Sequence, residues 1–213
     1  TAYTIWANNS GGSSAAYLNI TVVDELPALS YSPSALDLTN NTVSSDLPLV
    51  PTVAGAGEIT SWFINASLPA GLSFGTSNGT IWGTPTELWP QRSYTVLANN
   101  SGGTSVAYLN ITVVDELPTL SYSPSTLLMT MGNQSSDLPL NATLNGSGAI
   151  ISWEINPTLP AGLNFGTSNG TIWGIPTVLQ TTTTVYTVWA NNTGGSTSAT
   201  INITIIDEPP GPF

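Results

Sequence analysis

The sequence predicts an all-β protein built from tandem β-sandwich domains, with no helices of note, and three observations support this prediction. Short runs of alternating apolar and polar residues are separated by Gly, Pro, Asn and Ser, without helical periodicity. One stretch occurs twice with only two differences, as residues 68–86 and 159–177. The two copies lie 91 residues apart, which is the period of a string of domains rather than of a solenoid of short repeats.

The repeated stretch is predicted to form a β-hairpin. Asn78-Gly79 and Asn169-Gly170 are expected to supply the positive φ angles that a tight turn needs, between runs that alternate apolar and polar residues. Alternation with a period of two places Leu72 and Phe74 on one face, and Ile81 returns toward that face. The hairpin therefore has one apolar side, which is expected to face a core.

Each full repeat is predicted to contain seven or eight short strands. In the first repeat we expect them at residues 28–31, 35–38, 47–53, 60–64, 72–74, 80–82, 94–99 and 106–114. The second repeat follows the same plan as far as Ile206. This number of short strands in about 90 residues suits a two-sheet immunoglobulin-like sandwich.

Two complete domains and one partial domain are predicted. The complete repeats span residues 26–116 and 117–208, and residues 209–213 are expected to be a Pro-rich linker or terminus. Residues 1–25 correspond only to the last two strands of a repeat, and an isolated hairpin is marginal in water. We expect another segment to complete this hairpin. That segment belongs either to a longer tandem array of which this chain is an excerpt, or to a neighbouring subunit.

The motifs of each repeat resemble those of a known family. They are Leu-Pro-Ala-Gly-Leu-x-Phe from Leu68, Gly-Thr-Ile-Trp-Gly-x-Pro-Thr from Gly79, Tyr-Thr-Val from Tyr94, and the loop Asn-Asn-Ser-Gly-Gly from Asn99. They resemble the putative-Ig repeats of large prokaryotic surface proteins. That family is related to cadherin-like and dystroglycan-type modules and is common in archaeal cell-surface proteins. The resemblance covers nearly the whole chain and implies a β-sandwich scaffold.

The charge balance excludes several classes of partner. Twelve acidic residues face a single base, Arg92, and the formal net charge is −11. Nucleic acid is excluded because almost nothing could neutralise its phosphates, and anionic membrane surfaces are excluded for the same reason. No apolar run approaches the roughly 18 residues needed to cross a bilayer, so we expect no membrane insertion by this segment.

Catalysis has little chemical support, and we predict that the chain is not an enzyme and has no catalytic residues. Without His, Cys or Lys there is no usual base for a serine nucleophile, no soft-metal site and no Schiff-base amine. A carboxylate pair could cleave glycosides, but Glu58, Glu87 and Glu154 occupy unrelated positions in the repeats. No organic cofactor is expected.

An acidic pair recurs at each predicted domain junction. The three pairs are Asp24-Glu25, Asp115-Glu116 and Asp207-Glu208, each followed closely by Pro. Cadherin-type modules, which the family resembles, bind Ca²⁺ at junctions, and Ca²⁺ takes six to eight oxygen ligands. These six acids are therefore candidate Ca²⁺ ligands. The alternative is an ordinary solvated linker that binds no metal.

Glycosylation sequons are unusually frequent. Asn-x-Ser/Thr with x other than Pro occurs at Asn8, Asn19, Asn40, Asn65, Asn78, Asn99, Asn110, Asn133, Asn141, Asn145, Asn169, Asn191 and Asn202. In the run from Leu18 to Val22, alternation turns Asn19 away from the apolar Ile20 and Val22. We predict covalent N-glycans and an extracellular or cell-surface location. The alternative is a polar β-protein with incidental sequons.

Comparison of the repeats separates tryptophans that are predicted to face the core from those of a candidate interaction surface. Trp62 and Trp153 are predicted to face the core, because Glu154 stands at the position of Phe63 and marks the other side as wet. The candidate interaction surface consists of Trp6, Trp82, Trp89, Trp173 and Trp189. Exposed aromatics could contact a neighbouring domain or subunit, stack on sugar, or be covered by attached glycans and loops.

These features predict a structural subunit of an extracellular glycosylated filament or surface array, with subunits joined by inter-subunit strand pairing. Its partners would be copies of itself or neighbouring repeats of a longer chain, together with covalent N-glycans. The competing prediction is a cell-surface adhesin or an array of carbohydrate-binding modules. Regular fibres in micrographs would favour the first prediction, and sugar binding that depends on Trp82 and Trp173 would favour the second.

Overall fold

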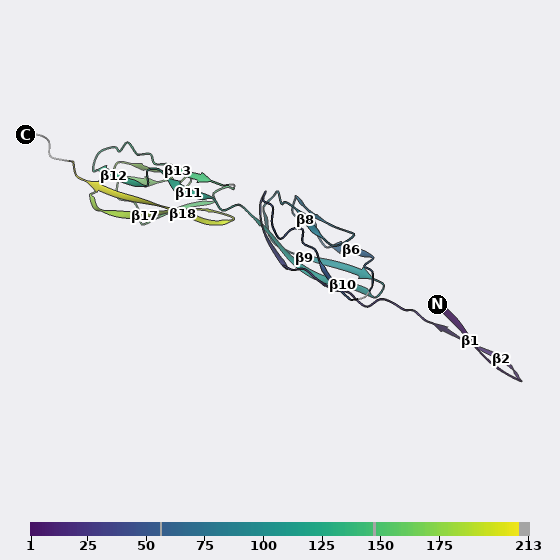
Figure 1. The fold of residues 1–213 in the computed structure, drawn as a ribbon. Coiled ribbons are helices and arrows are strands. Elements are labelled where there is room, and N and C mark those ends of the chain that lie inside the picture. The colour runs from purple at the N-terminus through teal and green to yellow at the C-terminus, as the bar shows by residue number, and fades with distance from the viewer. Residues whose placement is uncertain (56, 147, 209–213) are drawn as a thin grey trace, which may run out of the picture. The chain divides into compact units, whose positions relative to one another are not determined.

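The computed structural model describes residues 1–55, 57–146 and 148–208 and confirms the all-β fold class (Figure 1). Every regular element in these residues is a strand, and none forms a helix that could cross a membrane. The predicted linker at 209–213 lies outside the described residues. The chain divides into two compact units, Thr1–Asp37 with Val43–Thr112, and Leu38–Thr42 with the chain from Val113 onward. The predicted domain limits stay predictions.

The first full repeat contains a four-stranded sheet in the order β4-β10-β9-β6. Two short ladders, β3-β5 and β7-β8, form the rest of its strands, and Leu49 bridges to Ile81. The strands are β3 Ala28–Ser30, β4 Ala35–Thr39, β5 Thr52–Ala54, β6 Ser61–Ile64, β7 Leu72–Phe74, β8 Ile81–Gly83, β9 Trp89–Asn100 and β10 Gly103–Val114.

The second full repeat has the same topology. Its four-stranded sheet has the order β12-β18-β17-β14, in which β12 and β18 are parallel and the other pairs antiparallel. The short ladders are β11-β13 and β15-β16, and Leu140 bridges to Ile172. The strands are β11 Thr119–Tyr122, β12 Thr126–Thr130, β13 Ala142–Asn145, β14 Ser152–Asn156, β15 Leu163–Phe165, β16 Ile172–Gly174, β17 Gln180–Asn192 and β18 Gly195–Ile206.

The core of each repeat is formed by alternate residues of the long hairpin. Every second side chain is buried in β17 from Tyr186 to Asn192 and in β18 from Ile201 to Ile205. The apolar ones form one core cluster with buried side chains of β12, β14 and β16. The central members in the second repeat are Leu127, Met129, Trp153, Ile172, Tyr186, Val188, Ile201, Ile203 and Ile205. The prediction that Trp62 and Trp153 face the core is confirmed, since they are 8% and 7% exposed.

The predicted strand at 47–53 is wrong in extent. Leu49 makes one isolated bridge, and the regular strand β5 begins only at Thr52. Pro48 and Pro51 lack a backbone N–H, so a continuous ladder cannot run through them. By contrast the last two predicted strands are longer than expected, because β9 begins at Trp89 and β10 at Gly103.

The turn of the β7-β8 hairpin is wider than the sequence predicted. Gly79 has a φ of 70°, as expected, but Asn78 does not adopt a positive φ. The Gly79 N–H donates to the Gly75 carbonyl at 2.7 Å, and the Asn78 side-chain oxygen accepts from the Thr80 N–H at 3.1 Å. Asn78 therefore stabilises the turn through its side chain rather than its backbone angle.

A buried tyrosine fastens this turn to each core. The Tyr31 hydroxyl donates to the Gly79 carbonyl at 2.6 Å, and Tyr122 makes the same bond to Gly170 at 2.6 Å. Burial raises the pKa of Tyr31 to about 12 and also raises the pKa of Tyr122. Both phenols are therefore held in the neutral, donating form over an unusually wide pH range.

These tyrosines predict a loss of stability at alkaline pH. Their pKa is higher in the folded chain than the ordinary value of about 10, so unfolding releases their protons more readily. The contribution of the two tyrosines to the free energy of unfolding should be constant below about pH 10 and should fall as the pH rises toward 12. Thermal melts across this range should show the fall, and replacing both Tyr31 and Tyr122 with Phe should make it shallower. An unchanged pH dependence in that variant would contradict this explanation.

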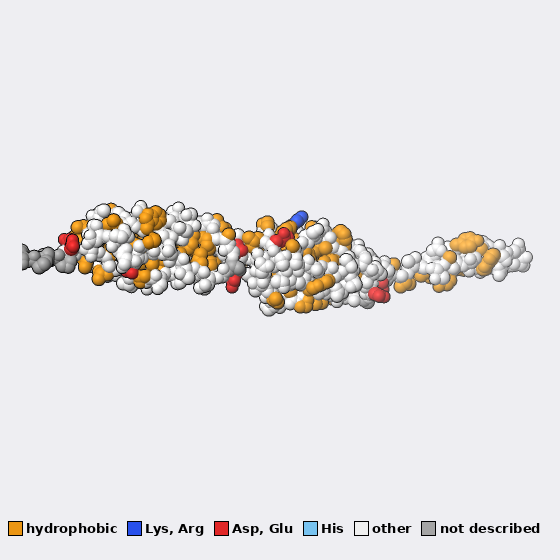
Figure 2. Space-filling model, turned by 90° about the horizontal axis from the view of Figure 1, so that it is seen from above, with side chains coloured by type: hydrophobic (Ala, Val, Ile, Leu, Met, Phe, Trp, Pro, Cys, Tyr) orange, Lys and Arg blue, Asp and Glu red, His pale blue; other side chains and the backbone are white. Residues whose placement is uncertain are grey.

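The N-terminal hairpin comprises β1 Ala2–Asn9 and β2 Gly12–Asn19. These strands pair only with each other among the described residues, and Thr1 and Ile20 extend the ladder by two hydrogen bonds. The expected completing segment is therefore not found in the described part of this chain. Figure 2 shows hydrophobic side chains lying open on this hairpin.

Exposure shows how much of a core face the hairpin leaves uncovered. Tyr3, Ile5 and Leu18 are 48%, 55% and 45% exposed. The residues 91 positions later are Tyr94, Val96 and Leu109, and they are 0%, 0% and 1% exposed. The same apolar face is thus buried in a complete repeat and open in the hairpin. We call the face formed by Tyr3, Ile5, Ala7, Ala16, Leu18 and Ile20 the open hairpin face.

Candidate functional site

The first acidic pair lies against the turn between β9 and β10. The Asp24 N–H donates to the Ser101 hydroxyl at 2.8 Å, and that hydroxyl donates to the Asp24 carboxylate at 2.7 Å. The Asn100 side-chain amide donates to the Glu25 carbonyl at 2.6 Å, while its oxygen accepts from the Gly102 N–H at 2.9 Å. Asn100 therefore holds its own turn with one atom and the acidic segment with the other.

The second acidic pair makes the same contacts with the turn between β17 and β18. The Asp115 N–H donates to the Thr193 hydroxyl at 2.8 Å, which in turn donates to the Asp115 carboxylate at 2.7 Å. The Asn192 amide donates to the Glu116 carbonyl at 2.7 Å and accepts from the Gly194 N–H at 2.9 Å. We call each such arrangement of an Asp-Glu segment on an Asn-Ser/Thr-Gly turn a junction clamp.

The glycine of each clamp turn allows the acidic segment to approach the backbone. A Cβ placed on Gly102 would lie 2.1 Å from the Asp24 carbonyl oxygen, and one on Gly194 would lie 2.2 Å from that of Asp115. No side chain fits between the turn and the segment at these distances. The Asn-Asn-Ser-Gly-Gly loop seen in the sequence is therefore a receiving surface for the Asp-Glu pair.

The clamp predicts that Asp115 stabilises the second unit. Its carboxylate is buried and accepts the Thr193 hydroxyl bond. Replacing Asp115 with Ala should lower the free energy of unfolding by about 1–3 kcal/mol, because a hydrogen bond to a charged group is lost in a shielded place. Asp137→Ala is the matched control, since Asp137 is an exposed acid on the same unit. Equal values for the two variants, measured by denaturant unfolding, would contradict a structural role for Asp115.

Two of the predicted Ca²⁺ ligands, Asp24 and Asp115, take part in the junction clamps. Asp24 and Asp115 each direct a carboxylate oxygen to a hydroxyl of the receiving turn. Among the described residues no group of three or more His, Cys, Asp or Glu side chains lies close enough together to hold a metal ion. The six to eight oxygen ligands that Ca²⁺ takes are therefore not assembled by acidic side chains there. The Ca²⁺ ligands stay a prediction.

The predicted glycosylation sites differ in accessibility. Eight of the sequon asparagines are exposed, namely Asn8, Asn19, Asn65, Asn78, Asn133, Asn141, Asn145 and Asn169. Five are partly buried, namely Asn40, Asn99, Asn110, Asn191 and Asn202. The Asn99 side-chain nitrogen donates to Ser61 at 2.8 Å, and that of Asn191 donates to Ser152 at 2.9 Å. A glycan would have to be attached to that same nitrogen.

The five tryptophans of the candidate interaction surface are not equally exposed. Trp6 is largely open, and Trp82 and Trp173 are 44% and 43% exposed at equivalent positions of the two full repeats. Trp89 and Trp189 are only partly exposed. The Arg92 guanidinium carbon lies 5.9 Å from the Trp89 ring centroid, within the range of a cation–π contact. The two equivalent tryptophans are thus the recurring open aromatic feature of the full repeats.

Comparison with known proteins places the chain in a family. Residues 26–114 and 111–206 match the family model described as "Putative Ig domain". The chain belongs to this family. The resemblance inferred from the repeated motifs is confirmed, and with it the fold class of tandem immunoglobulin-like β-sandwiches.

Curated relatives of this Ig-domain chain include adhesins. The "Serine-rich adhesin for platelets" of Staphylococcus aureus strain MRSA252 is 31% identical over 159 residues, which is 71% of this chain and 11% of that protein. The protein of the same name from strain USA300 is also 31% identical over 159 residues, covering 71% of this chain and 6% of that protein. The chain therefore spans about a tenth or less of these relatives.

Solved structures with tandem domains are similar at low identity. The titin I-band fragment I67–I69 is 18% identical, with a TM-score of 0.46, and the match covers 96% of this chain and 74% of that one. A protocadherin gammaB7 structure of domains EC3–6 is 14% identical, with a TM-score of 0.38, and the match covers 96% and 58% of the two chains.

Proposed function

We propose that the chain is a structural subunit of an extracellular, glycosylated filament or surface array built from tandem Ig-like domains. The observation that carries this proposal is the open hairpin face, which repeats the composition of a core and has no cover in the described part of the chain. Each large aliphatic side chain moved from water into a core contributes about 1.5–3 kcal/mol. A partner that covers Ile5, Leu18 and Ile20 therefore gains substantial association energy.

The hairpin also offers two unpaired strand edges. In the complete repeats the strand equivalent to β2 pairs with a parallel strand, as β18 does with β12, and the strand equivalent to β1 pairs with an antiparallel one, as β17 does with β14. In the hairpin both outer edges lack a partner among the described strands. Exposed edges of this kind add strands from another chain. We therefore propose inter-subunit strand pairing with a neighbouring copy or with neighbouring repeats of a longer chain.

The surface chemistry supports a location outside the cell. Thirteen sequons, many with exposed asparagines, suit a glycoprotein, and the single basic residue leaves nucleic acid and anionic membrane as poor partners. The similarity to staphylococcal adhesins supports a cell-surface role of the same broad kind. An archaeal source is part of this proposal, because the family that the motifs resemble is common in archaeal cell-surface proteins. We propose no enzymatic activity and no organic cofactor, because the sequence has no His, Cys or Lys to act as a base, a soft-metal ligand or a Schiff-base amine.

The second candidate function is a cell-surface adhesin or carbohydrate-binding array. The observation that favours it is the pair of open indole rings of Trp82 and Trp173, which repeat at equivalent positions. Aromatic rings of this kind stack on sugars as well as on protein partners. Binding to a glycan array that disappears in the Trp82→Ala, Trp173→Ala double variant would support adhesion.

Electron microscopy of native material and of the purified chain tests the main proposal. We expect regular fibres or lattices whose subunits are connected through the N-terminal hairpin. Particles that stay monomeric at high protein concentration, with the hairpin unpaired, would contradict it. Sugar binding without any ordered assembly would favour the adhesin instead.

Glycan occupancy should follow the availability of the asparagine side-chain nitrogen. We expect low occupancy at Asn99 and Asn191, whose nitrogens are engaged by serine hydroxyls, and high occupancy at Asn78 and Asn169. In the latter two the side-chain oxygen accepts the turn bond, and the nitrogen makes no hydrogen bond within the part of the chain that the structure describes. Glycopeptide mass spectrometry of native protein measures each site. Full occupancy at Asn99 and Asn191 would contradict the hydrogen bonds described above.

A further inference from the structure

We propose that the indole rings of Trp82 and Trp173 are platforms for the chain's own sugars, namely the N-glycans attached at Asn78 and Asn169. This inference rests on the glycosylation in the proposed function and names the side chains that hold two of the glycans in place. It assigns the two recurring open tryptophans to sugars of the same chain rather than to sugars of a partner.

In the first repeat the indole lies beside a sequon asparagine at the turn of the short hairpin. Trp82 is on β8, and Asn78 is in the turn that joins β7 to β8. A Cβ placed on Gly75 would lie 2.2 Å from the Asn78 side-chain oxygen and 3.2 Å from the Cζ3 atom of the Trp82 indole. Both side chains therefore approach the same point, and they have room to do so because Gly75 has no side chain.

The second repeat has the same arrangement. A Cβ on Gly166 would lie 2.1 Å from the Asn169 side-chain oxygen and 3.3 Å from Cζ3 of Trp173. Both asparagines are exposed, and the two indoles are open to nearly the same extent. Each full repeat thus builds one pair of an open indole and a sequon asparagine.

The turn fixes the orientation of each asparagine. The Asn78 side-chain oxygen accepts from the Thr80 N–H at 3.1 Å, and the Asn169 oxygen accepts from the Thr171 N–H at 3.1 Å. A glycan would be attached to the side-chain nitrogen, which is bonded to the same carbon as this oxygen. The first sugar therefore begins next to the indole, on a side chain that is already held in one orientation.

The chemistry of the indole favours an attached sugar as its occupant. One face of a sugar ring presents C–H groups, which pack on the face of an aromatic ring while the hydroxyls stay in water. Covering an open indole also removes apolar surface from water. Because the sugar is covalently attached nearby, the contact forms at a high effective concentration, so even a weak stacking interaction is enough.

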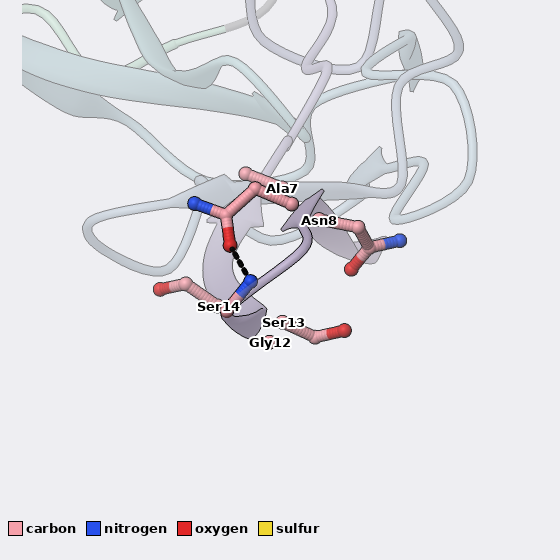
Figure 3. A pocket seen from close by; sticks show the side chains of 7 residues that line it. Ala7, Asn8, Gly12, Ser13 and Ser14 are labelled. Atoms are coloured by element: carbon pink, nitrogen blue, oxygen red, sulfur yellow. Dashed lines mark hydrogen bonds between the residues drawn. The ribbon is translucent and has the colours of Figure 1, made fainter.

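A sequon asparagine does not by itself have such a neighbour. In the N-terminal hairpin, residues 7–9 and 11–14 line an open hollow of about 490 Å³, and none of them is aromatic. Figure 3 shows the sequon residue Asn8 there, with its side chain directed away from the hydrogen bond drawn across the turn. The pairing of a turn asparagine with an indole is therefore not a general consequence of a sequon.

Hydroxyl-radical footprinting of the glycosylated chain tests this contact, because the oxidation rate of an indole reports its exposure. The Thr80→Val, Thr171→Val double variant removes both sequons but keeps each asparagine and the backbone N–H of its turn bond. The Thr80→Ser, Thr171→Ser double variant is the matched control, because Asn-x-Ser is still a sequon.

We expect Trp82 and Trp173 to be oxidised at least threefold faster in the valine variant than in the natural chain, and at the natural rate in the serine variant. The buried Trp62 and Trp153 should react equally slowly in all three proteins, which shows that the fold is intact. Equal oxidation of Trp82 and Trp173 in all three, with glycans found at Asn78 and Asn169, would overturn this inference alone.

Glycopeptide mass spectrometry of the natural chain separates the other outcomes. Glycans at other sequons but none at Asn78 and Asn169 would also overturn this inference and leave a glycosylated protein standing. A chain without glycan at any sequon would overturn the glycosylation in the proposed function as well.

A second readout leaves both sequons unchanged. In the Trp82→Ala variant, peptide N-glycosidase should release the glycan at Asn78 faster, because the sugar has lost its platform. We expect the ratio of release rates at Asn78 and Asn169 to rise at least threefold over that of the natural chain, since Trp173 is still present. An unchanged ratio would contradict the proposed contact.

Discussion

Replacing Trp153 with alanine should lower the free energy of unfolding of the second unit by about 3–5 kcal/mol. The indole is 7% exposed and packs in the core with Leu163, Ile172 and Val188. A Cβ on Gly170 would lie 2.4 Å from the indole, so the ring also supports the turn that Tyr122 fastens. Alanine would leave a cavity that the surrounding strands cannot close, because their backbones are held by ladder bonds.

Trp173→Ala is the matched control for this prediction. Trp173 lies in the same unit and is the same residue type, but it is 43% exposed on the outer side of β16. Its removal should cost about 1 kcal/mol or less. Calorimetric or denaturant unfolding of both variants measures the difference. Similar losses would mean that the two faces of the sandwich are not distinguished as the structure describes.

Replacing Ile5 with aspartate should abolish assembly of the chain. Ile5 lies in the middle of the open hairpin face, and Val96 at the equivalent position of the first repeat is fully buried. A partner that covers this face would lose an aliphatic contact and would have to bury an unpaired carboxylate, which costs several kcal/mol. We therefore expect association to weaken at least a hundredfold. Sedimentation and micrographs at increasing protein concentration measure the loss.

Thr4→Asp controls for the added charge. Thr4 is next to Ile5 on β1 but pairs across the strand with Tyr17, on the opposite face of the hairpin. It should leave assembly nearly unchanged, whereas Ile5→Asp should leave monomers. If both variants assemble as well as the natural chain, the open hairpin face is not an interface and the proposed strand pairing is lost. If both fail, general charge repulsion explains the effect instead.

Much of the fold was predictable because its causes are local. Period-two alternation placed Leu72 and Ile81 on one apolar face, and both are buried. The alignment of Phe63 with Glu154 between the repeats assigned Trp62 and Trp153 to the core. The prolines at 48 and 51 could have shortened the predicted strand, since the missing N–H groups were visible in the sequence.

The junction clamps were not predictable in the same way. The Asp-Glu pair and the Asn-Asn-Ser-Gly-Gly loop both stand out in the sequence, because they recur with the same period. Nothing in either pattern indicated that they meet, because Asp24 and Ser101 are separated by 77 residues. The acidic pairs were therefore interpreted as Ca²⁺ ligands or as solvated linkers. A shared period is the only sequence signal that could have suggested contact.

The sequence by itself determined most of the strand pattern, the domain-sized repeat, the family and the inward direction of Trp62 and Trp153. These follow from alternation and turn chemistry between residues that are neighbours along the chain. Only the tertiary structure decided which turn receives which acidic pair, which asparagine nitrogens are engaged, and that the N-terminal hairpin keeps its apolar face open. Those facts depend on packing and hydrogen bonds between residues that are far apart in the sequence and that only the tertiary fold brings into contact.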